Sequence, residues 1–142
     1  MKKIVWALLV CALFCASGFA KSFKSPKVAE KEISKAINFF ANGQSQSGAD
    51  LLKPYTNLSD ESIERLVVDS DENWSEFLSK FGRNLGVELI DIDTEGSSLA
   101  QLVHVVRLED YPIIFRTTLY RNDEGWKIIA FSYNAEPEEL FK

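Results

Sequence analysis

The sequence has two cysteines, Cys11 and Cys15, and none after residue 15. A domain built from the later residues therefore has no disulfide and no thiol nucleophile. His104 is the single histidine, so the usual nitrogen and sulfur ligands of zinc and iron sites are missing. The sequence also lacks a glycine-rich phosphate loop, a Gly-x-Ser-x-Gly elbow and a stripe of basic and aromatic residues. We expect no metal and no cofactor.

Long apolar runs are absent except in the first 20 residues, MKKIVWALLVCALFCASGFA. Lys2 and Lys3 form a positive n-region and residues 4–14 an apolar segment, while Gly18 and Ala20 place small side chains at the two positions that a signal peptidase reads. The apolar segment is shorter than the roughly 20 residues that a membrane span needs. The sequence therefore predicts a signal peptide that is cleaved near Ala20, export to the periplasm or the extracellular space, and no stable membrane anchor.

The chain that remains after cleavage is acidic. Residues 1–20 hold two of the sixteen basic residues and none of the twenty-one acidic ones, so the formal charge of the rest is −7. This balance argues against nucleic acid and anionic lipid as partners, because both are bound through Lys and Arg. The length of residues 21–142 fits one domain with a real core. We expect its core to span residues 27–133, followed by a short polar tail at residues 134–142.

Between residues 26 and 82, apolar residues recur at the spacing of an α-helix. A first helix is predicted to begin after the N-cap Ser25 and to end at Gly43. Its apolar stripe consists of Ala29, Ile33, Ala36, Ile37 and Phe40. Residues 44–48 are predicted to form a loop, and residues 49–52 a single helical turn.

A second helical segment is predicted to begin after the N-cap Ser59. Its apolar stripe is interrupted by the acidic residues 69–72 and resumes at Trp74 until Gly82. The interruption predicts one broken helix or two short ones.

From residue 85 the apolar period changes to two, which indicates β-strands. Four runs are separated by short turn-forming links: residues 85–93, 98–108, 112–121 and 126–133. Helices followed by an antiparallel meander predict the α+β class, with N-terminal helices packed on a four-stranded antiparallel sheet.

Two-residue turns at residues 95–96 and 110–111 would place His104 opposite Val87 and Thr117. One face of the sheet is then apolar enough for the helices to cover. The opposite face also carries apolar residues, among them Val103, Val105, Ile114 and Tyr120. Such a face usually marks a contact surface, and we expect a homodimer through it. The alternatives are a cover by the tail at residues 134–142 or by another protein.

The order of these elements and the segment Phe115–Arg121 followed by Gly125-Trp-Lys-Ile-Ile129 resemble nuclear-transport-factor-like domains, the cystatin-like α+β cone. The resemblance covers about residues 27–133. It implies a curved sheet whose helix-covered face lines a pocket. The superfamily includes ketosteroid-isomerase-like enzymes, polyketide cyclases, transport adaptors and small secreted domains. No catalytic motif of those enzymes matches this sequence residue by residue.

His104 is the candidate catalytic residue, because a histidine in the cone can act as general acid or base near neutral pH. Thr117 is its expected neighbour, and a buried histidine that is hydrogen-bonded to Thr117 is the favoured interpretation. His104 together with Phe115, Trp74 and Phe77 is the candidate lining of a pocket for a small apolar ligand. Aromatic residues at this spacing also fit a plain core.

Two acidic clusters, residues 69–73 and 91–96, begin like calcium-binding loops. The first has Trp74 and Lys80 where such a loop has Gly and Glu, and the second has Leu102 at its twelfth position. We interpret them as a helix break and a hairpin turn.

These observations favour an exported, non-enzymatic domain that binds a periplasmic protein or a small apolar molecule. One alternative is an isomerase-like or cyclase-like enzyme that uses His104. The other is a periplasmic inhibitor or assembly factor that acts through the face of the sheet.

Overall fold

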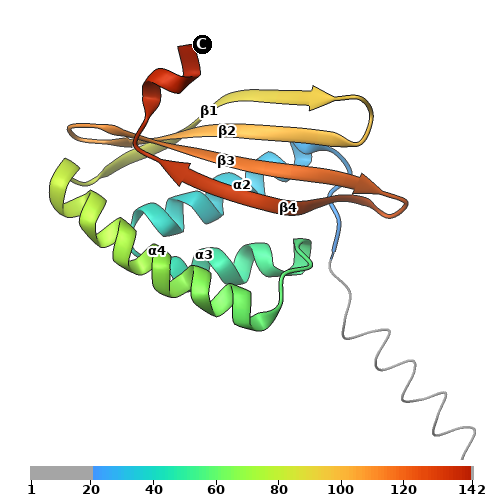
Figure 1. Cartoon of the computed structure of the whole chain (residues 1–142), viewed down its shortest axis with the longest axis horizontal. Helices are drawn as coiled ribbons and strands as arrows, with labels where there is room; N and C mark the ends of the chain where they lie inside the picture. Colours follow the sequence, from blue (N-terminus) through green and yellow to red (C-terminus); the bar gives the residue numbers. More distant parts are fainter. Residues whose placement is uncertain (1–20, 142) are drawn as a thin grey trace, which may run out of the picture.

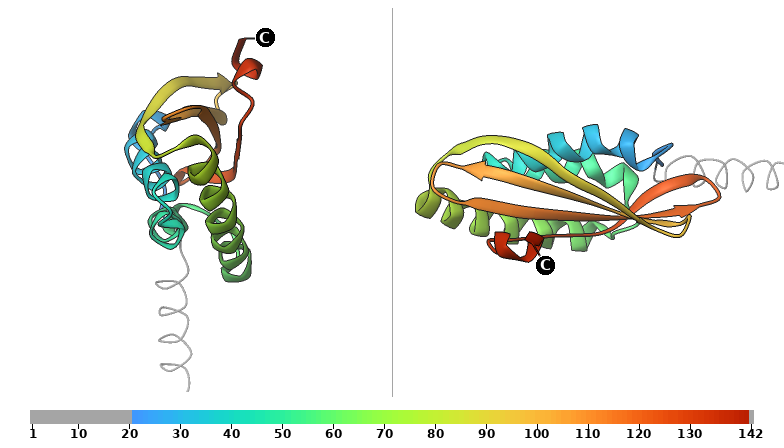
Figure 2. Two further views of the ribbon diagram at one scale, coloured as in Figure 1. Left: turned by 90° about the vertical axis from the view of Figure 1, so that its left-hand side faces the viewer. Right: turned by 90° about the horizontal axis from the view of Figure 1, so that it is seen from above.

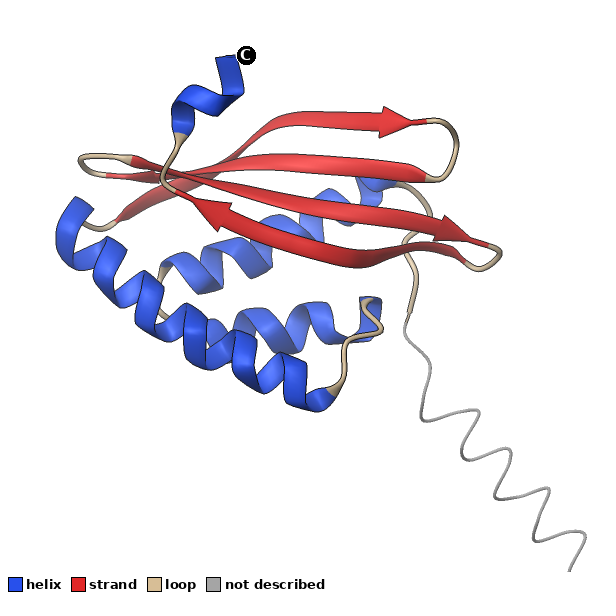
Figure 3. Cartoon of the chain, viewed as in Figure 1, coloured by secondary structure: helices blue, strands red, loops and turns tan. Residues whose placement is uncertain are grey.

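The computed structural model of the chain describes residues 21–141. The predicted signal peptide at residues 1–20 lies outside this range. Three α-helices pack on one face of a four-stranded antiparallel sheet (Figure 1, Figure 3). The predicted α+β class is therefore confirmed. No helix within residues 21–141 is both long enough and apolar enough to cross a membrane.

The first helix, α2 (Pro26–Ala41), forms as the sequence predicts. The Ser25 side chain accepts a hydrogen bond from the backbone N–H of Val28, which caps the helix, and proline occupies the first helical position. Every residue of the predicted apolar stripe is buried. This helix packs along β1 and β2, so its stripe is the main cover of the sheet.

The predicted loop at residues 44–48 is wrong, because most of it belongs to the helix α3 (Ser45–Leu52), which continues into the 3-10 helix η1 (Lys53–Tyr55). Gly48 lies inside α3, where its lack of a side chain allows close contact with α2. A Cβ atom at Gly48 would lie 2.9 Å from the carbonyl oxygen of Ala36 and 3.0 Å from the ring of Phe40. The missing side chain lets α3 approach α2 closely.

The third helix, α4 (Asp60–Phe81), is continuous, which corrects the predicted break at residues 69–72. The buried positions along it are Ile63, Val67, Ser70 and Trp74, at helical spacing. Ser70 occupies an inward position of the stripe, where it accepts a hydrogen bond from the Tyr133 hydroxyl at 3.4 Å. The stripe therefore continues through a polar residue, and the acidic side chains around it face solvent.

The sheet consists of β1 (Asn84–Glu95), β2 (Leu99–Leu108), β3 (Pro112–Asn122) and β4 (Gly125–Asn134), in the order β1-β2-β3-β4. All four strands lie within two residues of their predicted bounds. The views from the side and from above show that the sheet is twisted and curves over the helices (Figure 2).

The predicted register is displaced, and the predicted faces are correct except beyond the bulge in β1, where Asp91 lies on the outer face and Ile92 packs against the core. His104 lies opposite Leu89 and Phe115, and Thr117 lies opposite Leu102. The links between the strands are longer than two residues, and a bulge between Leu89 and Asp91 inserts one more residue into β1. A displacement of two residues keeps each side chain on its face but changes its neighbour.

The predicted polar tail is structured. β4 runs to Asn134, and the residues after it form the 3-10 helix η2 (Pro137–Phe141), which contacts β3 on the face away from the helices (Figure 1). Ile114, expected to be open on that face, is 0% exposed, and Val103 is also buried. Part of the outer face is thus covered within one chain.

Candidate functional site

His104 belongs to a buried pair that the sequence did not predict. It lies in β2 on the helix-covered face and is 0% exposed. Its Nε2 atom lies 3.3 Å from Oε1 of Glu30, which α2 supplies. The side chain of Glu30 is 25% exposed, so the pair connects the interior with the surface.

Burial lowers the pKa of His104, because loss of water disfavours the charged imidazolium, while the hydrogen bond and the charge of Glu30 act in the opposite direction. The imidazole is therefore neutral at pH 7 and has one N–H. When Nε2 donates this N–H to the carboxyl oxygen of Glu30, Nδ1 is the unprotonated nitrogen. Nδ1 then has a free lone pair in the interior, where it makes no hydrogen bond with residues 21–141.

The predicted partnership of His104 with Thr117 does not form. Thr117 is buried on β3, and its hydroxyl makes no hydrogen bond within the described chain. Because Thr117 lies opposite Leu102, it is diagonal to His104 instead of facing it.

The other candidate pocket residues form an aromatic cluster that fills the cone. Phe115 and Trp74 are buried, and Phe77 packs against them partly exposed. The Phe115 ring lies 5.5 Å from that of Tyr133, which in turn lies 5.4 Å from Trp74, and Trp74 meets Phe77 edge-on at 5.3 Å. These distances are those of packed aromatic pairs. A ligand would have to displace part of this cluster.

A groove of about 480 Å³ lies between α2 and β1, on the open side of the Glu30–His104 pair. It is lined by Glu30, Lys31, Glu32, Ser34, Lys35, Asn38 and Val87. Every lining residue except Val87 belongs to α2, and Val87 belongs to β1. Glu30 is thus the member of the pair that a molecule in the groove can reach.

The first residues of β4, at one edge of the sheet, are covered by other parts of the chain. Phe23 forms an antiparallel bridge with Trp126, and Thr56 forms a parallel bridge with Ile128. The ring of Phe23 stacks on that of Tyr55 at 3.8 Å. The N-terminal segment and Thr56, which follows η1, therefore cover the first part of β4, whereas residues 129–134 have no bridge on that side within residues 21–141.

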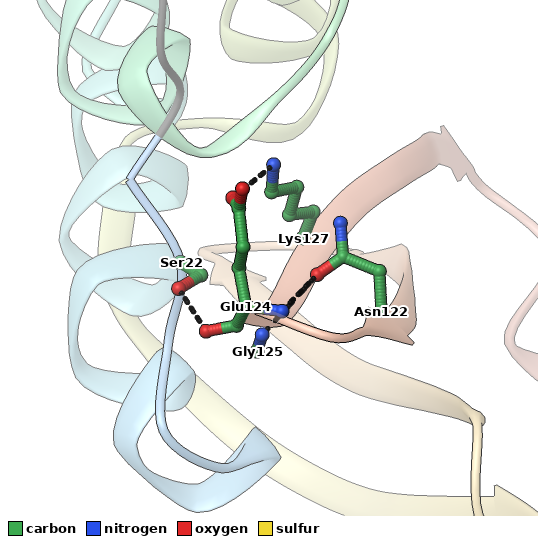
Figure 4. A network of polar contacts seen from close by, with 5 residues as sticks. All are labelled: Ser22, Asn122, Glu124, Gly125 and Lys127. Carbon is green, nitrogen blue, oxygen red and sulfur yellow. Dashed lines mark hydrogen bonds and ion pairs between the residues drawn. The ribbon is translucent and has the colours of Figure 1, made fainter.

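A polar network fastens this cover to the turn between β3 and β4 (Figure 4). The Ser22 hydroxyl donates to the carbonyl oxygen of Glu124 at 2.8 Å. Asn122 Oδ1 accepts from the backbone N–H groups of Glu124 and Gly125, and Lys127 pairs with the Glu124 carboxylate at 3.1 Å.

The edge at β1 is different, because β1 pairs with β2 alone. Four carboxylates lie on its outer face, at the positions opposite Val105, Val103, Gln101 and Leu99 of β2: Glu88, Asp91, Asp93 and Glu95. All four are exposed, and none forms an ion pair or a hydrogen bond within residues 21–141. At the bulge, Leu89 is 36% and Ile90 46% exposed.

Glu30 was missed by the sequence reasoning. It follows Ala29 and precedes Ile33 by three positions, so it borders the apolar stripe of α2. Its position at the border of a buried stripe could have marked Glu30 as a candidate. Its contact with His104 on β2, however, depends on how α2 lies across the sheet.

Sequence comparison finds no matching family model and no similar curated protein. Comparison of structures finds a proposed NTF2-like transpeptidase from Campylobacter jejuni, with a TM-score of 0.54 and 16% identity, covering 72% of this chain and 97% of that one. The chain has the NTF2-like, cystatin-like fold.

Two further structures are more distant. An NTF2-like protein of unknown function from Shewanella baltica has a TM-score of 0.43 and 11% identity, covering 81% of this chain and 99% of that one. The intermembrane space region of the chloroplast protein ARC6 has a TM-score of 0.44 and 12% identity, covering 80% and 98%.

Proposed function

We propose that this NTF2-like domain is an exported, non-enzymatic binding domain that recognises a partner protein with its outer surface. The observation that carries the proposal is the complete burial of His104 among packed core side chains, with its Nε2 hydrogen-bonded to Glu30. A general acid or base must reach the substrate's proton, and this imidazole reaches no surface. The surface, by contrast, has large exposed apolar side chains such as Val68 and Ile90.

The proposal is tested on the protein purified from cells that export it, by native mass spectrometry and by cross-linking before lysis. We expect the mass of the chain without a bound small molecule, and a cross-linked adduct with one or a few proteins. A small molecule bound at one copy per chain would contradict the proposal. The mass of the purified chain also tests cleavage near Ala20.

An isomerase-like or cyclase-like enzyme is the second candidate, and one observation favours it. Glu30 lines the groove between α2 and β1 while His104 holds its carboxylate, which is the arrangement of a general base and a positioning residue. For this function, native mass spectrometry would show a bound small molecule. That molecule would be lost from Glu30→Gln protein whose circular dichroism is unchanged.

A homodimer through the outer sheet face stays a prediction. Ile114 and Val103 are buried within one chain, so Val105 and Tyr120 are the predicted contact residues that keep exposed area. A stable interface buries roughly 800 Å² per partner, which is more than the side chains of Val105 and Tyr120 can supply by themselves. Sedimentation velocity of the purified domain decides the matter, with Tyr120→Glu as the variant that should dissociate such a dimer without entering the core.

A further inference from the structure

The free edge of β1 is a backbone surface that this fold leaves available. The strand is twelve residues long and has hydrogen-bonded neighbours on one side only. The N–H and C=O groups that point away from β2 can pair with another extended chain. Within residues 21–141 no β-bridge forms on this side of β1, unlike the bridges of Phe23 and Thr56 to β4. Only the start of the strand is occupied, because Asn84 hydrogen-bonds to Asn38 and Asn42 of α2 and accepts from the N–H of Gly86.

The side chains of β1 differ on its two faces. The outer face is acidic, with Glu88, Asp91, Asp93 and Glu95 exposed and unpaired within residues 21–141. On the inner face, Val87 forms a wall of the groove against α2. A strand added beside β1 would place alternate side chains over the acidic row and over this groove.

Charge decides between the possible occupants of this edge. In a pair of β1 strands from two copies, each strand would bring the same four carboxylates to the outer face of the joint. Like charges on adjacent strands destabilise their pairing. A strand with basic side chains on that face would instead neutralise the row.

We infer that β1 docks an extended, basic segment of a partner polypeptide, which adds to the sheet as a fifth strand. The inference rests on the proposed function and specifies its partner. Backbone hydrogen bonds to β1 hold the segment, Lys or Arg side chains face the acidic row, and the intervening side chains enter the groove beside Val87. The bulge at Ile90 interrupts the edge but keeps Glu88 and Asp91 on the same face, so the segment pairs with residues 87–89 beside the groove and continues along residues 91–95 beside the rest of the acidic row.

The probe is a synthetic, end-blocked peptide of eight residues in which lysine and valine alternate. Its binding to residues 21–142 is measured by fluorescence anisotropy at two salt concentrations. We expect saturable binding that weakens with salt, because the charged groups are exposed. Two versions of this peptide, one N-methylated at each valine and one at each lysine, lose the N–H donors of opposite edges of the strand. The version whose methyl groups face β1 should bind at least about ten-fold more weakly than the other. Equal binding of the two peptides would overturn strand addition.

The decisive variant reverses three charges on the strand: Glu88→Lys, Asp91→Lys and Asp93→Lys. The matched control reverses three exposed carboxylates on α4: Asp71→Lys, Glu72→Lys and Glu76→Lys. Both variants change the net charge by the same amount. The β1 variant should bind the lysine–valine peptide about ten-fold or more weakly and gain affinity for a glutamate–valine peptide. The α4 variant should bind within about two-fold of the parent. Equal weakening in both variants would show attraction to net charge alone and overturn the inference.

Two outcomes separate this inference from the proposed function. If a partner protein cross-links equally to the parent and to the β1 variant, the binding function stands and the assignment to β1 is wrong. If the parent sediments as a dimer that the β1 reversal abolishes, the occupant is a second copy, and the inference of a basic partner segment is wrong.

Discussion

The two edges of the sheet are built in opposite ways. At β4, the N-terminal segment and Thr56 cover the first part of the strand, and the network around Glu124 holds the N-terminal segment in place. At β1, no β-bridge within residues 21–141 forms on the side away from β2, and a row of carboxylates with a bulge limits what can pair there. In this fold, contacts within the chain protect the start of β4, whereas at β1 the exposed carboxylates determine which added strand can pair.

The cover of β4 should be the more costly to remove. Phe23→Ala deletes a buried ring that stacks on Tyr55 and anchors the bridge to Trp126. We expect a loss of about 3 kcal/mol in the free energy of unfolding, typical of a buried Phe→Ala change. In thermal denaturation the melting temperature should fall by roughly 10 °C or more. Leu89→Ala at the open edge is the control and should cost less than about 1 kcal/mol. Equal losses would abolish the distinction between the edges.

Two turns at the same end of the sheet, between β1 and β2 and between β3 and β4, offer a smaller contrast. Gly125 (φ 136°) and Gly96 (φ 60°) both have positive φ, but a Cβ atom at Gly125 would lie 2.8 Å from the carbonyl oxygen of Phe23, whereas one at Gly96 meets nothing within 4 Å. Gly96→Ala should cost about 1 kcal/mol of backbone strain. Gly125→Ala adds a collision with the cover and should cost about 2–3 kcal/mol. Chemical denaturation measures the stability of both variants. Identical midpoints would contradict the close approach of Gly125 to Phe23.

A pH effect is expected on the side of β1, where His104 packs beside Leu89. Because the folded-state pKa of His104 is lowered, the unfolded chain binds more protons between that pKa and about 6.5. The contribution of His104 to stability is therefore complete above pH 6.5 and is lost as the pH falls through the folded pKa. The melting temperature should decrease from pH 7.5 to pH 5.

The matched variant is His104→Gln, whose amide can still donate to Glu30. Its melting temperature should change less over the same interval, although it is lower at pH 7.5. A parallel decrease in both proteins would assign the pH effect to other groups.

Ser22→Ala should have the smallest effect. It removes the hydrogen bond to the Glu124 carbonyl at an exposed position, and we expect a loss of about 0.5–1 kcal/mol. Limited proteolysis near the N-terminus should accelerate while the melting temperature changes by a few degrees. A loss as large as that of Phe23→Ala would mean that the polar network, and not the buried ring, holds the cover in place.

The fold was predictable because periodicity and caps are local signals. Ser25 and Ser59 mark the helix starts, and the change of period after Gly82 marks the sheet. The site was less predictable because it depends on register and helix placement. The extra residue at the bulge in β1 cannot be found by counting turns, and a contact between Glu30 and His104 across 74 positions leaves no pattern in the sequence.

The account is tested most directly by hydrogen exchange of the whole domain, measured by mass spectrometry with and without the lysine–valine peptide. It predicts that amides of residues 84–95 exchange more slowly with the peptide bound, while those of residues 125–134 do not change. Slower exchange in residues 125–134, or none in residues 84–95 at saturating peptide, would contradict the claim that β1 is the open edge.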